Sequence, residues 1–269
     1  MQSCAVKGRT VGGGAPVRIM GIINCSPESF FSGSYVPGSA VRDRAFTMID
    51  EGADIVDVGA RSTAPGSVPI TVAEEIERIE TALSELDGSG IAVSVDTMYP
   101  EVLEACLRHD IHLINDISGL SNPAYARLAA DSDLPVVAMA TGRLPGDPKG
   151  TKATLAALGQ VTERARAAGI EGLILDPAVG RWTPERTYAD DWELCRNFGR
   201  FKAAGYPILL AISRKSFIGD LIGRPSEERL AATLALTANL LPDADMVRTH
   251  DVAATHDAVR VIRHMERSL

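Results

Sequence analysis

The stretch "DIVDVGARSTAPGSVPITVAEEIERIETALSEL", residues 54–86, contains a strand, a loop and a helix in that order. It begins with a short run dominated by Ile and Val, which is typical of a buried strand. In the later part, Thr71 can cap a helix, Glu74 follows three residues on as in a capping box, and apolar residues then recur at helical spacing. The stretch therefore predicts one strand–loop–helix unit of an α/β protein.

The same unit recurs along the whole chain, because short apolar runs alternate with longer segments of helical periodicity. The predicted strands are 17–24, 54–58, 92–95, 112–115, 136–139, 173–176, 208–212 and 245–248. Eight such units over about 250 residues are the number and size of a (β/α)₈ TIM barrel, which is the fold we predict. A doubly wound open sheet is the alternative, because a sequence does not show closure directly.

The chain is expected to form one barrel domain over residues 17–269, since no shift in composition and no Pro/Ser-rich linker divides it. Residues 1–16 contain three consecutive glycines ahead of the first strand, and we expect them to form a flexible leader. They lack the apolar run of a signal peptide. The four cysteines are scattered singly, which favours a reduced, cytoplasmic protein.

The charge balance limits the kinds of partner. The chain carries 27 basic and 35 acidic residues, a formal net charge of -8. This excess of acid does not favour general attraction to nucleic acid or to an anionic membrane, and no stretch is long and apolar enough to span a bilayer. We therefore expect small-molecule partners, and any phosphate must be bound by local groups.

Polar side chains follow several predicted strands, where the loops of a barrel build the active face. Asp96, Asn115 and Asp176 end three different strands, so we expect them to meet in one cavity. Two carboxylates and an amide can bind the donor-rich edge of a heterocycle. Taken singly, Asp57 and Asp116 are interpreted as helix caps or loop braces.

A second group of polar residues is suited to an anion. Arg248 and His250 lie two residues apart, hence on the same side of an extended strand end, and Asn24 ends the first strand. Together they could seat a phosphate or diphosphate, with a divalent cation bridging to it. The other histidines do not have a metal-ligand spacing, so a zinc site is not expected.

A basic pair follows the seventh predicted strand, in "SRKSFIG" (213–219). Lys215 can donate to a ring carbonyl or ring nitrogen, while Arg214 can reach a carboxylate or phosphate. The alternative is that both are solvated at a helix start, although cations there oppose the helix dipole. No nucleophile-elbow motif is present, so a serine nucleophile is not expected.

Two loops, "CSPESFFSGSYVPG" (25–38) and "GARSTAPGSVP" (59–69), are long and rich in Ser, Gly and Pro. Loops of this kind at the active face are usually lids or substrate clamps. Phe30 and Phe31 in the first loop serve either as anchors of that loop or as a stacking surface for an aromatic substrate.

Short blocks spread along the chain resemble those of a known family. They are "MGIINCSPESF" (20–30), "GADIVDVGARSTAPG" (52–66), "VSVDT" (93–97), "INDISG" (114–119), "DPAVG" (176–180), "SRKSFIG" (213–219) and "VRTHDV" (247–252). In this order they resemble the signature blocks of dihydropteroate synthase, a pterin-binding (β/α)₈ enzyme family of folate biosynthesis. The resemblance implies condensation of 6-hydroxymethyl-7,8-dihydropterin diphosphate with p-aminobenzoate or a related arylamine, releasing diphosphate. It also implies a homodimer.

The resemblance assigns roles to individual residues. Those implied to hold the pterin ring or to line its slot are Asp96, Asn115, Ile117, Met139, Asp176 and Lys215. Those implied to hold the diphosphate, together with Mg²⁺, are Asn24, Arg248 and His250, with Asn24 as the metal ligand. Ser216 is implied on the arylamine side. The implied catalytic residues are Asp96, Lys215, Arg248 and His250, which would assist loss of diphosphate before the amine attacks.

The sequence departs from the family pattern on its loops. Ala64 stands where the pattern has arginine, although Arg61 is near, and Glu28 stands where the first loop usually has aspartate. After the fifth strand the histidine of the pattern is Ala140, and Arg181-Trp182-Thr183 replaces F-G-K after the sixth. A larger, ribosylated aniline as the amine, with weak inhibition by sulfonamides, is therefore a hypothesis beside p-aminobenzoate.

Two other classes of function remain open. One is a pterin-dependent methyltransferase that acts with a corrinoid protein, and the other is a pterin-binding protein without catalysis. A methyltransferase needs no diphosphate clamp, so the blocks "VRTH" (247–250) and "SRKS" (213–216) favour the synthase.

Overall fold

The computed structural model describes residues 2–26, 35–62 and 68–266. The strands of its main sheet are β3 (Arg18–Asn24), β4 (Ile55–Gly59), β5 (Val93–Asp96), β6 (Leu113–Asp116), β7 (Val136–Met139), β8 (Leu173–Asp176), β9 (Leu209–Leu210) and β10 (Met246–Thr249). All neighbours in this sheet pair in parallel, in the order β8-β7-β6-β5-β4-β3-β10-β9. A bridge between Leu175 and Ile208 brings the two edges together. This confirms the predicted barrel and excludes the open sheet.

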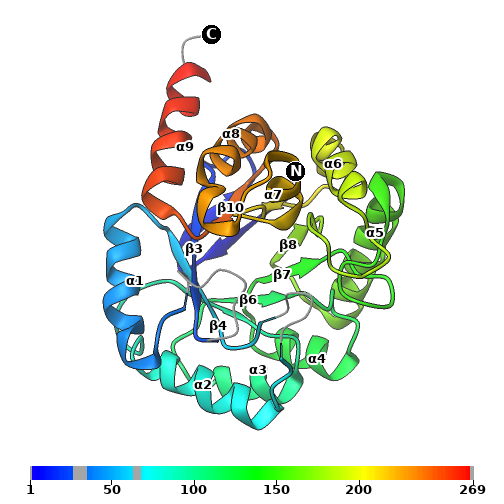
Figure 1. The fold of residues 1–269 in the computed structure, drawn as a ribbon. Helices are drawn as coiled ribbons and strands as arrows, with labels where there is room; N and C mark the ends of the chain where they lie inside the picture. Colours follow the sequence, from blue (N-terminus) through cyan, green and yellow to red (C-terminus); the bar gives the residue numbers. More distant parts are fainter. Residues whose placement is uncertain (1, 27–34, 63–67, 267–269) are drawn as a thin grey trace.

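Helices surround the barrel in chain order (Figure 1). They are α1 (Val41–Asp50), α2 (Val72–Ser84), α3 (Pro100–Cys106), α4 (Pro123–Asp131), α5 (Gly150–Ala168), α6 (Tyr188–Arg196), α7 (Ser216–Ile222), α8 (Leu230–Leu240) and α9 (Val252–Glu266). Short 3₁₀ helices cover Gly38–Ala40, Phe198–Ala204, Ser226–Glu228 and Leu241–Asp243. The predicted capping box of α2 is confirmed, because Thr71 and Glu74 each bind the other's backbone N–H.

Alternate side chains of each strand face the barrel interior, as the period of two in a strand requires. At the amino ends of the strands the interior is apolar and buried, with Met20, Ile55, Ala92, Leu113, Val137, Ile174, Leu209 and Met246 in one cluster. Two or four residues further along, the same alternation places the polar side chains of Asn24, Asp96, Asn115, Asp176 and Arg248 on the inner face. The fold therefore gathers them at one end of the barrel.

The amino end of the barrel is covered by a hairpin. Its strands β1 (Ser3–Val6) and β2 (Arg9–Gly12) pair antiparallel, and Val6 and Val11 are fully buried in the apolar cluster of the barrel interior. Gly12 adopts φ +81°, and a Cβ there would lie 2.5 Å from Pro207 Cγ. The prediction of a flexible leader over residues 1–16 was therefore wrong, because this segment buries the apolar end of the barrel.

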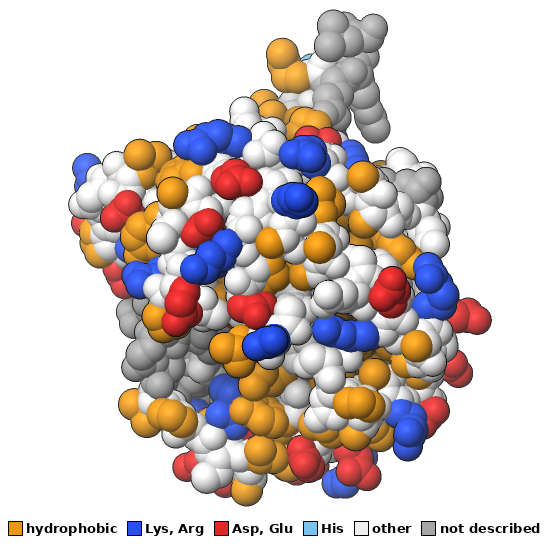
Figure 2. Space-filling model, turned by 90° about the vertical axis from the view of Figure 1, so that its right-hand side faces the viewer, with side chains coloured by type: hydrophobic (Ala, Val, Ile, Leu, Met, Phe, Trp, Pro, Cys, Tyr) orange, Lys and Arg blue, Asp and Glu red, His pale blue; other side chains and the backbone are white. Residues whose placement is uncertain are grey.

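The surface carries both signs of charge. Figure 2 shows the face on the right-hand side of Figure 1, where Lys and Arg side chains are interspersed with Asp and Glu and no patch of one sign dominates. In the described part of the chain, no helix has the length and apolar character needed to cross a membrane.

Candidate functional site

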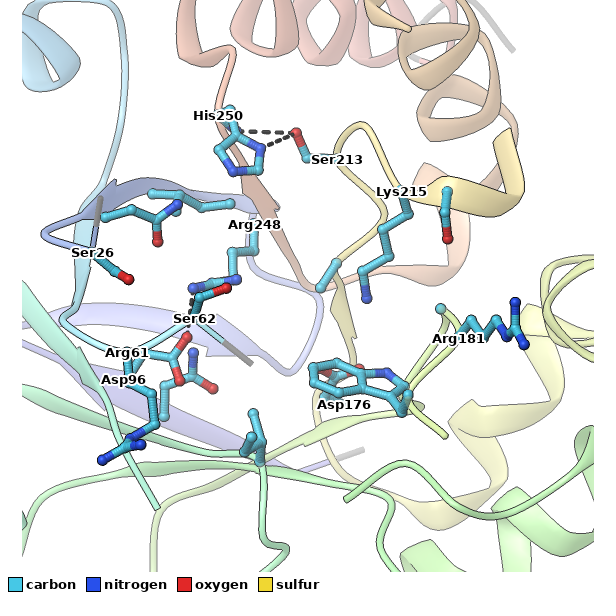
Figure 3. A pocket seen from close by; sticks show the side chains of 18 of the residues that line it. Ser26, Arg61, Ser62, Asp96, Asp176, Arg181, Ser213, Lys215, Arg248 and His250 are labelled. Carbon is cyan, nitrogen blue, oxygen red and sulfur yellow. Dashed lines mark hydrogen bonds and ion pairs between the residues drawn. The ribbon is translucent and has the colours of Figure 1, made fainter. Parts of the chain in front are cut away.

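A cavity of about 390 Å³ opens at the carboxyl ends of the strands (Figure 3). It is lined by nearly all of the residues that the sequence proposed: Asn24, Asp96, Asn115, Ile117, Asp176, Lys215, Ser216, Arg248 and His250. Met139 is the exception. It is 1% exposed, packs in the same apolar cluster as Ile117 and is not among the described residues that line the cavity.

The centre of the cavity is an ion pair network around Arg248. Its Nε donates to Asp57 Oδ2 at 2.7 Å, and its Nη2 donates to Asp96 Oδ2 at 2.7 Å. Asp57 is fully buried and also accepts hydrogen bonds from Ser94 Oγ at 2.5 Å and Asn115 Nδ2 at 3.0 Å. The interpretation of Asp57 as a cap or loop brace was therefore wrong, because this carboxylate orients both Asn115 and Arg248.

Asp116 behaves as expected. Its carboxylate accepts the backbone N–H groups of Ser118 at 2.7 Å and Leu120 at 2.6 Å, so it braces the loop after β6. It is fully buried and is not among the described residues that line the cavity.

The charges at the centre are set by burial and by these pairs. Burial raises the pKa of Asp96, and the neighbouring Arg248 guanidinium opposes that rise. Burial by itself would lower the pKa of Arg248, but the carboxylates of Asp57 and Asp96 outweigh it and raise that pKa. Arg248 therefore stays charged, and it is paired with both of these carboxyl groups inside the protein.

Asp176 and Lys215 form a second charged group. Burial raises the pKa of Asp176, while Lys215 opposes the rise, and its Oδ1 accepts the Ala178 N–H at 2.7 Å. Burial lowers the pKa of Lys215 to about 8, against the pull of Asp176. The Lys215 ammonium group donates to the carbonyl of Val179 and lies 5.0 Å from the centre of the Trp182 ring. Both functional groups are thus held at the cavity wall.

His250 is held by Ser213. The backbone N–H of His250 donates to Ser213 Oγ at 3.1 Å, and the same oxygen lies 2.9 Å from Nδ1 of the ring. Burial, with the nearby charge of Arg248, lowers the pKa of His250 to about 3. The imidazole is therefore neutral near pH 7. A hydroxyl that accepts from the backbone can donate its own proton to Nδ1, which leaves Nε2 carrying the ring N–H.

Two arginines near the cavity have structural partners. Arg61 donates to Glu75 Oε2 at 2.5 Å and to the Ile70 carbonyl at 2.8 Å, and its guanidinium lies 4.8 Å from the Tyr99 ring centre. Arg214 donates to both carboxylate oxygens of Asp251, at 2.8 and 2.7 Å. A carboxylate partner for Arg214 was one of the two expected. Arg61, the arginine close in sequence to Ala64, is thus already bound to Glu75 and to the backbone.

A buried ion pair that the sequence did not reveal supports the loop after β8. Arg186 and Asp191 are both fully buried, and Arg186 Nε donates to Asp191 Oδ1 at 3.0 Å. The same oxygen accepts the Gly180 N–H at 2.9 Å, and Arg186 Nη1 donates to the Gly146 carbonyl at 2.9 Å. This pair fixes the segment that carries Arg181 and Trp182. No motif marks it in the sequence.

Several expectations concern residues that the structure does not describe. Glu28, Phe30, Phe31 and Ala64 lie outside the described residues. Within the described ranges, no group of three or more His, Cys, Asp or Glu is arranged to hold a metal ion. A metal at this site would thus depend on amide oxygens and on the ligand itself.

The fold and the site together define a class, a (β/α)₈ barrel with a polar, mostly buried pocket at the carboxyl ends of its strands. Residues 20–250 match the family described as pterin binding enzyme. A dihydropteroate synthase of Mycobacterium leprae is 34% identical over an alignment of 267 positions that covers 92% of this chain and 93% of that protein. The chain belongs to the dihydropteroate synthase family.

Solved structures of dihydropteroate synthases are similar to this chain as well. The dihydropteroate synthase of Xanthomonas albilineans with 4-aminobenzoic acid superposes with a TM-score of 0.86, at 32% identity over 98% of each chain. A probable bifunctional folylpolyglutamate synthase/dihydropteroate synthase of Halobacterium salinarum is 33% identical over 92% of this chain, but the chain spans 31% of that protein's length. The similarity to that relative is thus confined to part of it.

Proposed function

We propose that the cavity catalyses the condensation of 6-hydroxymethyl-7,8-dihydropterin diphosphate with an arylamine, with p-aminobenzoate as the first candidate, and releases diphosphate. The observation that carries this proposal is the convergence of Asp96, Asn115, Asp176 and Lys215 on one cavity beside His250. The similarity to the Xanthomonas albilineans enzyme with 4-aminobenzoic acid supports the choice of amine. It also favours a synthase over a methyltransferase or a pterin-binding protein without catalysis.

The buried polar groups suit the pterin ring. The carboxylate of Asp176 can accept paired N–H groups from the aminopyrimidine edge, and the Lys215 ammonium can donate to a ring oxygen or nitrogen. Asn115 is oriented by its bond to Asp57 at 3.0 Å, so its amide offers the ring a fixed acceptor. These groups bind and orient the ring, and Ile117 supplies apolar contact.

The diphosphate belongs on the side of Asn24 and His250, both of which line the cavity. The Nε2–H of a neutral His250 can donate to a phosphate oxygen, and Ser213 holds the ring in that orientation. A positioned donor stabilises the charge that develops as the leaving group departs. Because the imidazole is neutral, the donor adds no buried positive charge when the site is empty of anion.

Mg²⁺ fits this donor set. It commonly binds proteins through few side-chain oxygens and completes its shell with substrate phosphates and water. Asn24 would supply a carboxamide oxygen, and Mg²⁺ bound there would neutralise charge on the diphosphate. The absence of a three-residue acidic or His/Cys cluster among the described residues is compatible with a cation held mainly by the substrate.

The bond changes follow from this arrangement. The C–O bond between the pterin methylene and the diphosphate breaks, and its electron pair leaves with the diphosphate. The lone pair of the amine nitrogen then forms the new C–N bond to the methylene carbon, and the nitrogen loses one of its two protons to water. Arg248 is paired with Asp57 and Asp96 at the centre of the cavity, so part of its charge is balanced before the substrate binds.

The proposal is tested with the purified chain, the pterin diphosphate, p-aminobenzoate and Mg²⁺. Chromatography should detect dihydropteroate, and a phosphate-coupled assay should detect one diphosphate released for each product formed. Omitting the amine controls for simple hydrolysis. If no arylamine is incorporated under any of these conditions, the proposed function is wrong.

A pH dependence follows from Lys215. Because burial lowers its pKa to about 8, the side chain is a cation below that pH and loses its charge above it. We therefore expect kcat/KM for the pterin diphosphate to fall as pH rises through about 8, since this parameter reports the free enzyme. Lys215→Arg should move the fall to higher pH, because a guanidinium stays protonated. A profile unaffected by this substitution would assign the fall to another group.

A further inference from the structure

The cationic side chains that line the cavity differ in whether a carboxylate lies close to them. They are Arg61, Arg181, Lys215 and Arg248. Arg61 is paired with Glu75, Arg248 is paired with Asp57 and Asp96, and Lys215 is attracted by Asp176. For Arg181 the described residues supply no carboxylate within ion-pair distance. Among the described residues, its charge is thus not balanced by a carboxylate.

The contacts of Arg181 are weak ones. Its Nη2 donates to the Pro184 carbonyl at 3.3 Å, and its guanidinium carbon lies 5.8 Å from the Tyr188 ring centre. The side chain is exposed, so neither contact costs much to replace. In Figure 3 Arg181 lies on the side of Lys215, across the cavity from Ser26 and Ser62, with its guanidinium turned outward.

The backbone beneath Arg181 is firmly placed. The preceding Gly180 donates its N–H to Asp191 at 2.9 Å, and Asp191 is held by the buried Arg186. A Cβ on Gly180 would lie 2.8 Å from Lys215 Cδ, so Lys215 packs directly on this backbone. The backbone next to Arg181 is therefore fixed against Lys215, the residue that we propose binds the pterin.

We propose that Arg181 binds the acidic group of the second substrate and makes the site selective for anionic arylamines. This inference rests on the proposed function. The reacting amine must face the pterin in the depth of the cavity, so a substituent para to it points outward toward the rim. There the guanidinium of Arg181 can reach a carboxylate, and Trp182 and Tyr188 also line the cavity.

Arg61, the other arginine on a loop of this cavity, does not provide this charge. Arg61 is engaged by Glu75 and by two backbone carbonyls, and moving it would leave a fully buried carboxylate without its partner. The loop pattern of the family has an arginine where this chain has Ala64. Arg181 therefore supplies a charge that neither Arg61 nor position 64 offers to the substrate.

The test compares two amines that share ring and nucleophile and differ in charge, p-aminobenzoate and p-aminobenzamide. Wild type is measured beside Arg181→Ala, Arg181→Glu and Arg181→Lys. The matched control is Arg196→Ala, an exposed arginine at the end of α6 that is not among the residues lining the cavity. The quantity measured is the ratio of kcat/KM for the two amines, at saturating pterin diphosphate.

We expect Arg181→Ala to lower the ratio of kcat/KM for p-aminobenzoate to that for p-aminobenzamide by roughly 10- to 100-fold, because the variant loses a charge-assisted hydrogen bond to the carboxylate. Arg181→Glu should lower it further, Arg181→Lys should retain most of it, and Arg196→Ala should leave it unchanged. The KM for the pterin diphosphate should change less than about twofold, because the pterin groups are untouched.

Two failures are distinguishable. If wild type incorporates p-aminobenzoate but the ratio is the same in Arg181→Ala and Arg181→Glu, this inference is overturned and the proposed function stands. If wild type incorporates neither amine, the proposed function fails and the inference falls with it. Efficient use of a larger, uncharged aniline in preference to p-aminobenzoate would also overturn the inference.

Discussion

Asp176→Asn is expected to weaken binding of the pterin diphosphate by roughly 30- to 1,000-fold, equivalent to about 2–4 kcal/mol. The carboxylate of Asp176 offers acceptors on both oxygens to the ring, whereas an amide offers one acceptor and one donor group. The substitution also removes the charge that attracts the buried ammonium of Lys215. Calorimetric titration of the pterin diphosphate into each purified variant gives the dissociation constant.

The control for this experiment is Asp257→Asn, which removes an exposed carboxylate on α9. It should leave the dissociation constant unchanged. Since Asp176 raises the pKa of Lys215 against the effect of burial, Asp176→Asn should also move the alkaline fall of kcat/KM to lower pH. Binding within about twofold of wild type would show that the ring does not contact Asp176.

Arg186→Ala is expected to lower the free energy of unfolding by about 3–5 kcal/mol, because it leaves the charge of Asp191 buried without its partner. Both side chains are fully buried, and their charged groups are 2.9 Å apart. Denaturant titration should show a lower midpoint with an unchanged slope.

Two further variants identify the cause. The double variant Arg186→Met with Asp191→Leu removes both charges together, and it should be less destabilised than Arg186→Ala because no unpaired charge remains. Arg196→Ala, an exposed change on the same helix as Asp191, should have little effect. Should Arg186→Ala unfold at the wild-type midpoint, the pair would not anchor the loop that carries Arg181.

The barrel was predictable because each of its units shows a short apolar strand pattern followed by apolar residues at helical spacing. The predicted strands 136–139 and 173–176 coincide with β7 and β8. By contrast, β9 covers only Leu209–Leu210 of the predicted 208–212. Local pattern cannot decide how many residues of an apolar run find a hydrogen-bonding neighbour, since that depends on the curvature of the closed sheet.

The hairpin at residues 3–12 was missed for a related reason. Its burial rests largely on Val6 and Val11, which gain stability only because the open end of the barrel is beside them. In isolation a two-stranded hairpin of this size is marginal in water. The partner that makes it fold is distant in sequence, so the local signal resembled a leader.

The site was predicted where a residue type and a strand end coincided, as for Asp96, Asn115 and Asp176. The role of a residue was not predicted where that role depends on a partner far away in the sequence. Asp57 looks the same in sequence whether it braces a loop or binds an arginine, and its partner Arg248 lies 191 positions away. The interaction of Asp57 with both Asn115 and Arg248 becomes visible only when β4, β6 and β10 share one barrel.

The ion pairs of Arg248 also bear on the order in which the protein acquires its activity. They join the last strand of the barrel to residues 191 and 152 positions earlier, and contacts of such separation form late because long loops must be ordered first. An intermediate that lacks β10 would hold the carboxylates of Asp57 and Asp96 without their cation. The complete set of ion pairs therefore exists only when β10 has joined β3 in the closed barrel.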